Sequence, residues 1–448
     1  MDQDRLDKWN KFLAAGLKLG NPVDFDSTNV LFLNKADDGI EIDACGRVME
    51  IMNLGNIIFL HIERTIMNFD KEPVIKLTQV VVSKKDAPEA HSLVKIYIQR
   101  GDIIGVSGVV YTTNIGVKSI KAVKLCLLTK CFNWIGKVLN DDSLVSDKEE
   151  LYRKPYIRMN VDNTTRDAFF AKALLLKILR QHLENEGFTE IETRILVPTN
   201  GGANAAPFKT HYNSIGEDRY LRIAPELDLK RAVVAGLGDV YEIGRCFRNE
   251  GRDKTHNPEF TTMEAYKTYQ DYTYWIDLFK CIYDSFTYFV DKQLSSSKWV
   301  EMKMIDFVSS YIPTTHETLV KDFDKLMDDP EVVAKYPYLI ITHHPTYDSP
   351  LAKPDGLYAE RAEVFIRGME VANMYTENVD PILQRKVFEE QVAKKDNHMG
   401  IDEDFIHALE LGCPPSSGIG VGVDRVVMQL LRLTDIRDVI MFPAYRTK

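Results

Sequence analysis

The sequence predicts a two-domain α+β protein, with a small β-barrel first and a larger mixed-sheet domain with flanking helices after it. The chain has 448 residues, and at roughly 100 to 200 residues per domain this length predicts two or three domains. Short β-rich runs fill residues 41–133, whereas helical and strand patterns alternate in residues 161–448. The polar stretch 134–160 between them is typical of a linker.

The composition is that of an ordinary globular protein. Hydrophobic residues make up 45% and charged residues 27%, which excludes wholesale disorder and a disulfide scaffold. The N-terminal sequence is charged, and no run of 18 or more apolar residues occurs. We therefore expect a cytoplasmic protein with no membrane partner. The six cysteines are scattered without a C-x-x-C pair, which favours reduced thiols over disulfides or a zinc site.

The net charge of -10 argues at first against nucleic acid, because phosphate binding normally needs surplus Lys and Arg. The charge is distributed unevenly, however. Residues 41–133 contain twelve Lys and Arg against nine Asp and Glu, so this segment is positive and the remainder carries -13. The first domain can therefore contact a polyanion while the rest of the chain stays acidic.

Residues 1–40 are expected to form a peripheral segment with one short helix from Leu6 to Leu19. The barrel that follows is predicted from five strands and one helix, in the order 43–52, 56–64, 73–82, helix 88–100, 101–113 and 119–129. A helix between the third and fourth of five strands is the order of an OB-fold, whose face commonly binds oligonucleotides. Another small β-domain is the alternative that the pattern leaves open.

The second domain is predicted to begin with an amphipathic helix. Thr164 and Asp167 resemble a capping box, apolar residues recur at i, i+4 spacing from Phe170 to Leu183, and Gly187 supplies a C-terminal stop. The run 188–198 alternates as a strand and ends at Pro198. Several further strands and helices follow to Lys448, which predicts a large mixed sheet in an α+β arrangement.

One strand in this domain is unusually polar. The run DVYEIGRCFRNE places Glu242, Arg248 and Glu250 on the same face. Burying an unpaired guanidinium is costly, so this face must meet either its own carboxylates or an anionic ligand. A structural ladder of Arg and Glu is therefore the alternative to a binding site.

A second polar block lies near the C-terminus. Gly418, Gly420 and Gly422 alternate along a strand and let a ligand approach the backbone closely, and Arg425 follows at the start of a helix. The block is neither a GxGxxG nor a P-loop. Arg248 and Arg425 together would offer two fixed cations for phosphate oxygens.

Taken together, these blocks resemble a known family. The helix–strand–proline unit, the FRNE block with HNPEF after it, and the GIGVGVDR block are similar to motifs 1, 2 and 3 of class II aminoacyl-tRNA synthetases, in that order. Further stretches narrow the resemblance to lysyl-tRNA synthetase and extend it over residues 41–448: GGANAAPF (201–208), APEL (224–227), SPLAK (349–353) and MEVANMYTENVDPILQRKVFEEQ (369–391). The resemblance implies an anticodon-binding OB-fold followed by an antiparallel-sheet catalytic domain, in a homodimer.

The resemblance also implies how ATP is held. Arg248 would contact the α-phosphate and the lysine carboxylate, Arg425 the γ-phosphate, and Phe260 would stack on adenine. The loop around ATP would contain Glu250, His256 and Asn257. Two carboxylates would hold Mg²⁺, which prefers hard oxygen ligands: Glu363 and Glu370.

The amino acid pocket implied by the resemblance consists of Gly202, Glu226, Arg248, Glu264, Tyr266, Asn373, Tyr375 and Glu377. Glu226 would bind the α-ammonium, and Glu377 with Tyr266 the ε-ammonium. A lysine side chain is an apolar stem that ends in a strongly hydrated charge. A site that removes this hydration must replace it with a carboxylate and hydrogen-bond acceptors. Tyr375 can cover the stem.

The implied reaction is ATP-dependent activation of L-lysine, followed by transfer of the lysyl group to tRNA(Lys), with Arg248 and Arg425 as catalytic residues. It needs no nucleophilic side chain. An aspartyl- or asparaginyl-tRNA synthetase would need a cationic or amide-reading pocket, whereas Glu226 and Glu377 are negative. A ligase that modifies a protein would normally lack the first domain. An inactive RNA-binding paralogue is a further alternative, and the intact set of Arg248, Glu363, Glu370 and Arg425 argues against it.

The barrel departs from the family pattern at its binding face. GRVMEIMNLGN lacks the second Arg and the Lys of the usual motif, and GVKS replaces G-E-L-S. Arg47 and Phe59 still match, and Phe59 is a suitable stacking platform for a single-stranded base. These two residues are therefore the expected anticodon contacts.

Overall fold

The computed structural model describes residues 2–20, 38–67, 73–133, 148–199, 201–202, 205–290, 298–393 and 401–444. It divides into two compact units, Met1–Asn163 and Thr164–Lys448. No helix within these described ranges is long and apolar enough to cross a membrane. All six cysteines lie in them as free thiols.

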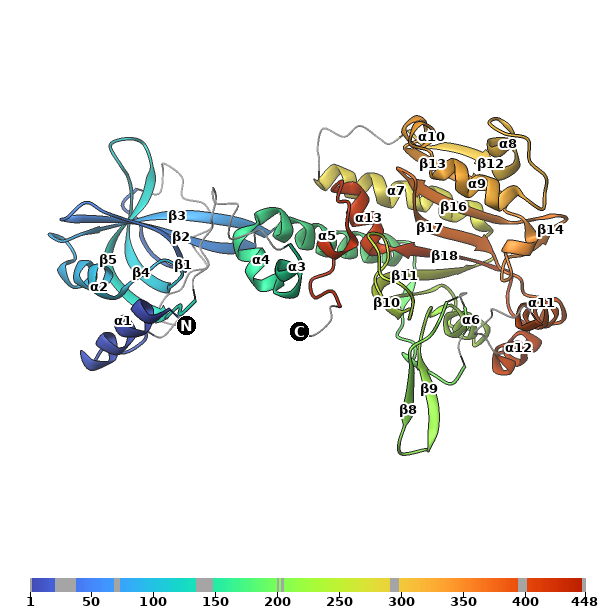
Figure 1. The fold of residues 1–448 in the computed structure, drawn as a ribbon, viewed down its shortest axis with the longest axis horizontal. Coiled ribbons are helices and arrows are strands. Elements are labelled where there is room, and N and C mark those ends of the chain that lie inside the picture. The colour runs from blue at the N-terminus through green and yellow to red at the C-terminus, as the bar shows by residue number, and fades with distance from the viewer. Residues whose placement is uncertain are drawn as a thin grey trace. The chain divides into compact units, whose positions relative to one another are not determined.

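The first unit contains a closed five-stranded barrel (Figure 1). Its elements are β1 (Glu41–Asn53), β2 (Ile57–Met67), β3 (Pro73–Ser83), α2 (Pro88–Tyr97), β4 (Ile103–Thr112) and β5 (Lys118–Thr129). The strands pair in the order β1-β2-β3-β5-β4, and β4 pairs with β1 to close the barrel. Alternate residues such as Val48, Leu60 and Val80 fill its interior. The predicted OB-fold order is confirmed.

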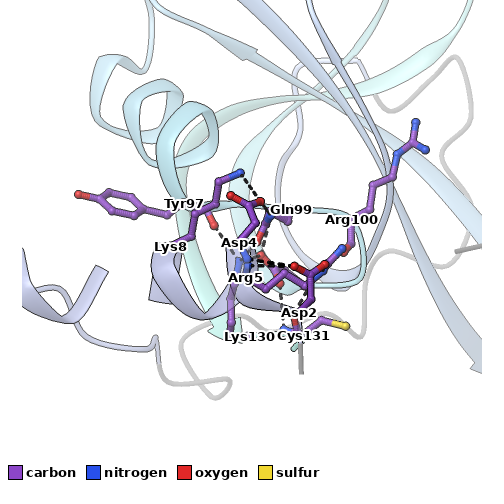
Figure 2. A network of polar contacts seen from close by, with 10 residues as sticks. Asp2, Asp4, Arg5, Lys8, Tyr97, Gln99, Arg100, Lys130 and Cys131 are labelled. Atoms are coloured by element: carbon purple, nitrogen blue, oxygen red, sulfur yellow. Dashed lines mark hydrogen bonds and ion pairs between the residues drawn. The ribbon is translucent and has the colours of Figure 1, made fainter. Parts of the chain in front are cut away.

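Helix α1 (Gln3–Ala14) packs onto this barrel. It begins earlier than expected because the Asp2 side chain caps it, accepting from the backbone N–H groups of Asp4 and Arg5. Phe12 joins the barrel core. The Arg5 guanidinium donates to the carbonyl oxygens of Arg100 at 2.8 Å and Cys131 at 3.1 Å, as Figure 2 shows. The helix is therefore part of the barrel unit.

A buried ion pair lies beside this contact. The Lys130 ammonium is 2.9 Å from the Asp102 carboxylate, and both side chains are at most 2% exposed. Lys130 also donates to the Tyr97 carbonyl and to the Gln99 amide oxygen (Figure 2). Asp102 accepts from the backbone N–H groups of Gln99 and Cys131. The pair thus ties the end of β5 to the loop before β4.

We expect Asp102→Ala to destabilise the barrel unit by about 3 to 5 kcal/mol, because it leaves the Lys130 ammonium buried without its counter-ion. Amide hydrogen exchange of the barrel strands measures this loss. Asp86→Ala is the matched control, since its partner Lys121 lies on the surface, and its exchange should stay close to that of the unaltered chain. Equal protection in both variants would contradict a structural role for the Asp102 pair.

The second unit contains an eight-stranded sheet in the order β12-β13-β16-β17-β18-β11-β10-β6 (Figure 1). Its strands are β6 (Thr189–Glu190), β10 (Val240–Phe247), β11 (Glu259–Thr268), β12 (Val300–Lys303), β13 (Tyr338–Thr342), β16 (Arg361–Ile366), β17 (Met369–Thr376) and β18 (Ser416–Gly422). All neighbours are antiparallel except β6 with β10 and β12 with β13. The predicted mixed sheet in an α+β domain is confirmed.

The two faces of this sheet differ in character. Helices α5 (Asn163–Asn185), α7 (Tyr272–Val290) and α13 (Val423–Leu430) form one apolar cluster with alternate residues of the central strands, including Met263, Val364 and Ile419. The intervening residues point to the opposite face and are mostly polar. The remaining helices are α3 (Lys148–Arg153), α4 (Pro155–Val161), α6 (Glu226–Val234), α8 (Met304–Ser309), α9 (Leu319–Met327), α10 (Pro330–Lys335), α11 (Pro381–Ala393) and α12 (Glu403–Glu410).

Two expectations from the sequence need correction. The run 188–198 is not one strand: β6 pairs with β10, whereas β7 (Leu196–Val197) pairs with β9 (Glu217–Leu221) in a separate sheet that also contains β8 (Lys209–Tyr212). The stretch 134–160 contains α3 and the start of α4, which has Pro155 in its first turn. Residues 134–147 lie outside the described ranges.

Candidate active site

The polar face of the sheet has a strip without side chains along β18. Gly418 pairs with Tyr266 of β11 on one side and Tyr375 of β17 on the other, and Gly420 pairs with Glu264 and Asn373 in the same way. A Cβ at Gly418 would lie 2.5 Å from the Tyr266 ring, so a side chain cannot be accommodated there. Bare backbone therefore forms a floor, and the neighbouring strands form its walls.

A cavity of about 420 Å³ lies over this floor. Most of the residues predicted for the site line it: Gly202, Glu226, Arg248, Glu250, His256, Asn257, Phe260, Glu264, Tyr266, Glu370, Asn373, Tyr375 and Arg425. Two predicted residues, Glu363 and Glu377, do not line it. Segments far apart in the sequence thus converge on one cavity within the second unit.

Arg248 lies at the end of β10 and faces this cavity. Its backbone N–H donates to the Pro258 carbonyl at 2.9 Å, and its guanidinium carbon lies 5.0 Å from the centre of the Phe260 ring. The buried Nε has no hydrogen-bond partner among the described residues. Glu242 does not pair with it, contrary to the ladder alternative, because Glu242 pairs at 2.6 Å with Arg222. Arg248 is therefore available for an anion.

Arg425 lies at the other end of the floor, in the first turn of α13. It donates to the Glu370 carbonyl at 3.1 Å, and its second terminal nitrogen is 3.0 Å from Nε2 of His256. Asp253 lies 2.9 Å from Nδ1 of the same ring. We assign the ring proton to Nδ1, which donates to Asp253, so that Nε2 accepts from Arg425. Arg425 is 25% exposed and reaches the cavity.

The carboxylates predicted to bind lysine lie at the Gly418 end. Glu226 is the first residue of α6, and the Tyr375 hydroxyl donates to its Oε1. Glu377 is 2% exposed, and burial raises the pKa of its carboxyl, whereas the adjacent Lys230 ammonium lowers it. Its Oε1 has no hydrogen-bond partner among the described residues, and it lies 2.6 Å from where a Cβ of Gly418 would be.

Glu264 lies between these two ends. Burial, reinforced by the nearby Glu226 carboxylate, raises the pKa of Glu264 to about 8. Arg248 and Arg222 act in the opposite direction. An incoming cation would favour the ionised form of this carboxyl as well.

The two carboxylates predicted to hold metal lie on paired strands, Glu363 on β16 and Glu370 on β17. Glu370 lines the cavity, with an oxygen 3.6 Å from Arg425. Glu363 is not part of the cavity lining, although its strand partner Asn373 is, and its carboxylate is paired with Arg361. Across the described ranges, no group of three or more His, Cys, Asp or Glu side chains could hold a metal ion.

Several charged residues of the site were not predicted from the sequence. Arg361 lines the cavity and donates to Asn373 at 3.1 Å, in addition to its pair with Glu363. Lys230 pairs with Glu226 and Glu377. The i, i+4 spacing of Glu226 and Lys230 on a helix was a signal for the first of these pairs. No local pattern indicated the second.

Asp424 directly precedes Arg425 in the GIGVGVDR block, and its contacts were not predicted from the sequence. It is 2% exposed, accepts from the Thr261 backbone N–H at 2.8 Å and pairs with Lys172. One carboxylate thus connects α13, β11 and α5. This connection fixes the start of α13, from which Arg425 projects.

In the barrel, Arg47 on β1 and Phe59 on β2 both point outward, because their neighbours Val48, Ile58 and Leu60 point into the core. Arg47 donates to the Gly101 carbonyl at 2.9 Å. Phe59 is partly exposed. Both side chains are therefore on the outer surface of the barrel.

Comparison with known proteins identifies the family. The family model for tRNA synthetases class II (D, K and N) matches residues 147–446. A lysine–tRNA ligase of Listeria monocytogenes is 34% identical over 456 residues, covering 91% of this chain and 87% of that protein. The chain is also 36% identical to a lysine–tRNA ligase of Enterococcus faecalis over 451 residues (91% and 87% covered) and 34% identical to one of Aliarcobacter butzleri over 499 residues (99% and 96% covered). The chain therefore belongs to the class II tRNA synthetases and, within them, to the lysine–tRNA ligases.

Proposed function

We propose that the protein activates L-lysine with ATP and transfers the lysyl group to tRNA(Lys). The observation that carries this proposal is the buried Glu377 carboxylate, whose Oε1 faces Gly418 at the cavity floor without a donor in the described structure. A buried carboxylate is costly unless a cation or hydrogen bonds compensate it. The ε-ammonium of lysine supplies such a cation, whereas aspartate and asparagine do not.

The first step joins the lysine carboxylate to ATP. A carboxylate oxygen bonds to the α-phosphorus while the bond to pyrophosphate breaks. Arg248 neutralises the charge on the α-phosphate, Arg425 holds the terminal phosphate, and Phe260 presents its ring to adenine. Such catalysis consists mainly of orientation and charge stabilisation. Glu250, His256 and Asn257 are proposed to bind ATP from the loop that surrounds it, and their place in the cavity lining supports this role.

The residues present fit Mg²⁺, which commonly takes one or two carboxylates and completes its shell with phosphate oxygens and water. We propose Glu370 and Glu363 as its protein ligands, since hard carboxylate oxygens from two paired strands are the donor set that this ion prefers. When bound, Mg²⁺ would neutralise phosphate charge. Arg361 holds Glu363 in place from the same strand.

In the second step a ribose hydroxyl of the tRNA attacks the lysyl carbonyl and releases AMP. We propose that the barrel binds the anticodon, with Phe59 stacking on a base and Arg47 contacting the backbone. The outward direction of both side chains supports this role. Because tRNA is the substrate, we propose that the protein acts in the cytoplasm.

Pyrophosphate exchange measured with each of the twenty amino acids tests this function. We expect ATP-dependent exchange with lysine alone, and charging of tRNA(Lys) when tRNA is added. Exchange with aspartate or asparagine would favour the other members of the family. Absence of exchange with every amino acid, in a folded protein that still binds tRNA, would favour an inactive RNA-binding paralogue.

We also propose that the protein is a homodimer, as C2 symmetry is the commonest oligomer geometry. Two apolar side chains that follow α5 and β6 are exposed: Ile195 at 45% and Leu196 at 47%. Adjacent exposed apolar side chains are typical of a protein–protein interface. Light scattering should give a two-subunit mass at micromolar concentration, and Ile195→Asp with Leu196→Asp should lower it. Leu357→Asp, on another exposed leucine, should not. A single-subunit mass with full activity would contradict the proposal.

A further inference from the structure

We propose that Lys230 is a positioning residue of the amino acid pocket. Its ammonium holds one oxygen of Glu226 and one oxygen of Glu377, and thereby directs the other oxygen of each carboxylate toward the substrate. This inference rests on the proposed function above. In this proposal, the Lys230 ammonium keeps both carboxylates ionised and oriented, so that together they can bind the ammonium of the substrate.

The position of Lys230 is the first argument. It lies on α6, one helical turn after Glu226, and is 3% exposed. Its Nζ is 2.7 Å from Oε1 of Glu226 and also pairs with Oε2 of Glu377. The ring centres of Tyr375 and Tyr266 lie 5.4 and 5.8 Å from the ammonium. Two carboxylates and two aromatic rings therefore surround one cation.

Lys230 lies behind the pocket wall and does not occupy the pocket. The cavity is lined by Glu226, Tyr266 and Tyr375, whereas Lys230 does not reach it. A substrate ammonium and the Lys230 ammonium can therefore be present together, on opposite sides of the same carboxylates.

The remaining carboxylate oxygens are the second argument. Oε2 of Glu226 lies 3.8 Å from the Cβ position of Gly202, and Oε1 of Glu377 lies 2.6 Å from that of Gly418. Both glycines line the cavity. Each carboxylate thus directs one oxygen to Lys230 and has the other oxygen beside a cavity-lining glycine. A substrate ammonium could bind this second oxygen.

Electrostatics give the third argument. The titratable groups around these carboxylates are Lys230 on α6, Glu264 and Tyr266 on β11, Tyr375 on β17 and the Cys413 thiol. Lys230 is the cation among them. Although burial opposes its charge, the two carboxylates raise the pKa of Lys230 above its usual value. Without this charge, the buried Glu377 carboxyl would keep its proton to a higher pH and would attract an ammonium less.

The test is Lys230→Met, which keeps an apolar stem of similar length and removes the charge. At pH 7 we expect the lysine KM in pyrophosphate exchange to rise at least about tenfold, because loss of an adjacent cation raises a carboxyl pKa by about one unit or more and each unit is a factor of ten in the ionised fraction. The KM for ATP should stay unchanged. Because only the ionised carboxylate binds lysine well, the lysine KM should fall back toward that of the unaltered chain as the pH rises to 9 and above.

Two further variants separate charge from packing. Lys230→Arg keeps the cation and should keep the pH profile of the lysine KM, even where its bulk changes kcat. Lys267→Met makes the same change at a lysine of β11 that pairs with Asp239 and lies over the rings of Phe188 and Tyr274. This variant should leave the lysine KM unaltered. If Lys230→Met does not fold, a shifted pH profile in Lys230→Arg would itself overturn the proposal.

Other results would overturn it directly. A lower lysine KM in Lys230→Met would show that Lys230 competes with the substrate, and an equal rise at every pH would show a packing role only. Failure of the proposed function is visible separately, because the unaltered chain would then not exchange pyrophosphate with lysine. In that case carboxyl carbon-13 NMR titration of both proteins without substrate still decides: a glutamate pKa that does not rise in Lys230→Met refutes the role of Lys230.

Discussion

Arg248→Ala should reduce kcat for adenylate formation by about 10² to 10³, the range for removing one preorganised donor to a transition state. The guanidinium faces the cavity, and its Nε has no partner among the described residues. The positive charge of Arg248 can therefore stabilise the negative charge that develops on the α-phosphate. Pyrophosphate exchange at saturating lysine and ATP measures the loss. Transfer from preformed lysyl-adenylate to tRNA should suffer less, since pyrophosphate has already left.

Two variants control this experiment. Arg248→Lys should recover only a small part of the rate, because an ammonium lacks the planar fork that binds two oxygens. Arg245→Ala removes an arginine from the same strand whose side chain is 44% exposed and pairs with Glu259, and it should exchange at a near-normal rate. If Arg248→Ala kept normal exchange but melted early, the side chain would have a structural role and the proposed mechanism would be wrong.

Glu377→Gln should weaken lysine binding by about 2 to 5 kcal/mol, the usual cost of truncating one partner of a buried charged hydrogen bond. The change removes the negative charge beside Gly418 and leaves the Arg425 end of the cavity intact. The lysine KM should therefore rise strongly while the KM for ATP barely moves. Steady-state exchange at varied lysine and at varied ATP separates the two effects.

Glu403→Gln is the matched control, because Glu403 pairs with Arg385 on the surface and is 63% exposed. Its lysine KM should equal that of the unaltered chain. An unchanged lysine KM in Glu377→Gln would remove Glu377 from the pocket, and the proposed preference for lysine would then lose its main support.

The sequence predicted elements whose pattern is local and missed those whose partners are distant. In the barrel, β1 alternates between buried and partly exposed residues from Ile42 to Val48, and the core residues of β2 also fall at alternate positions. The run 188–198 also alternates, yet Ile191 donates to Tyr241 whereas Ile195 accepts from Arg222, so the chain changes sheets midway. Alternation shows that a segment is extended but not which strand it pairs with.

The site shows the same limit. Most of its residues are in motifs that the resemblance supplied, and the fold brings them to one cavity. Lys230 occurs in an ordinary amphipathic helix, where its distant partner Glu377 gives no signal. The pair of Glu363 with Arg361 was also not predicted, because two residues that share one face of a strand carry no motif that signals their contact.

The strip without side chains along β18 also sets the distance between the two charged ends of the cavity floor. Strand residues advance by about 3.3 Å each. The register of β18 therefore fixes how far the Gly418 end, with Glu377, lies from the Gly422 end, where α13 begins with Arg425 in its first turn. A ligand lying along the floor meets a fixed charge at each end, and its length must match the separation. A diamino acid one methylene shorter than lysine would leave its ammonium short of Glu377 when its carboxylate is in line with the phosphate. We therefore expect the enzyme to disfavour such a shorter amino acid by about 1 to 3 kcal/mol per methylene.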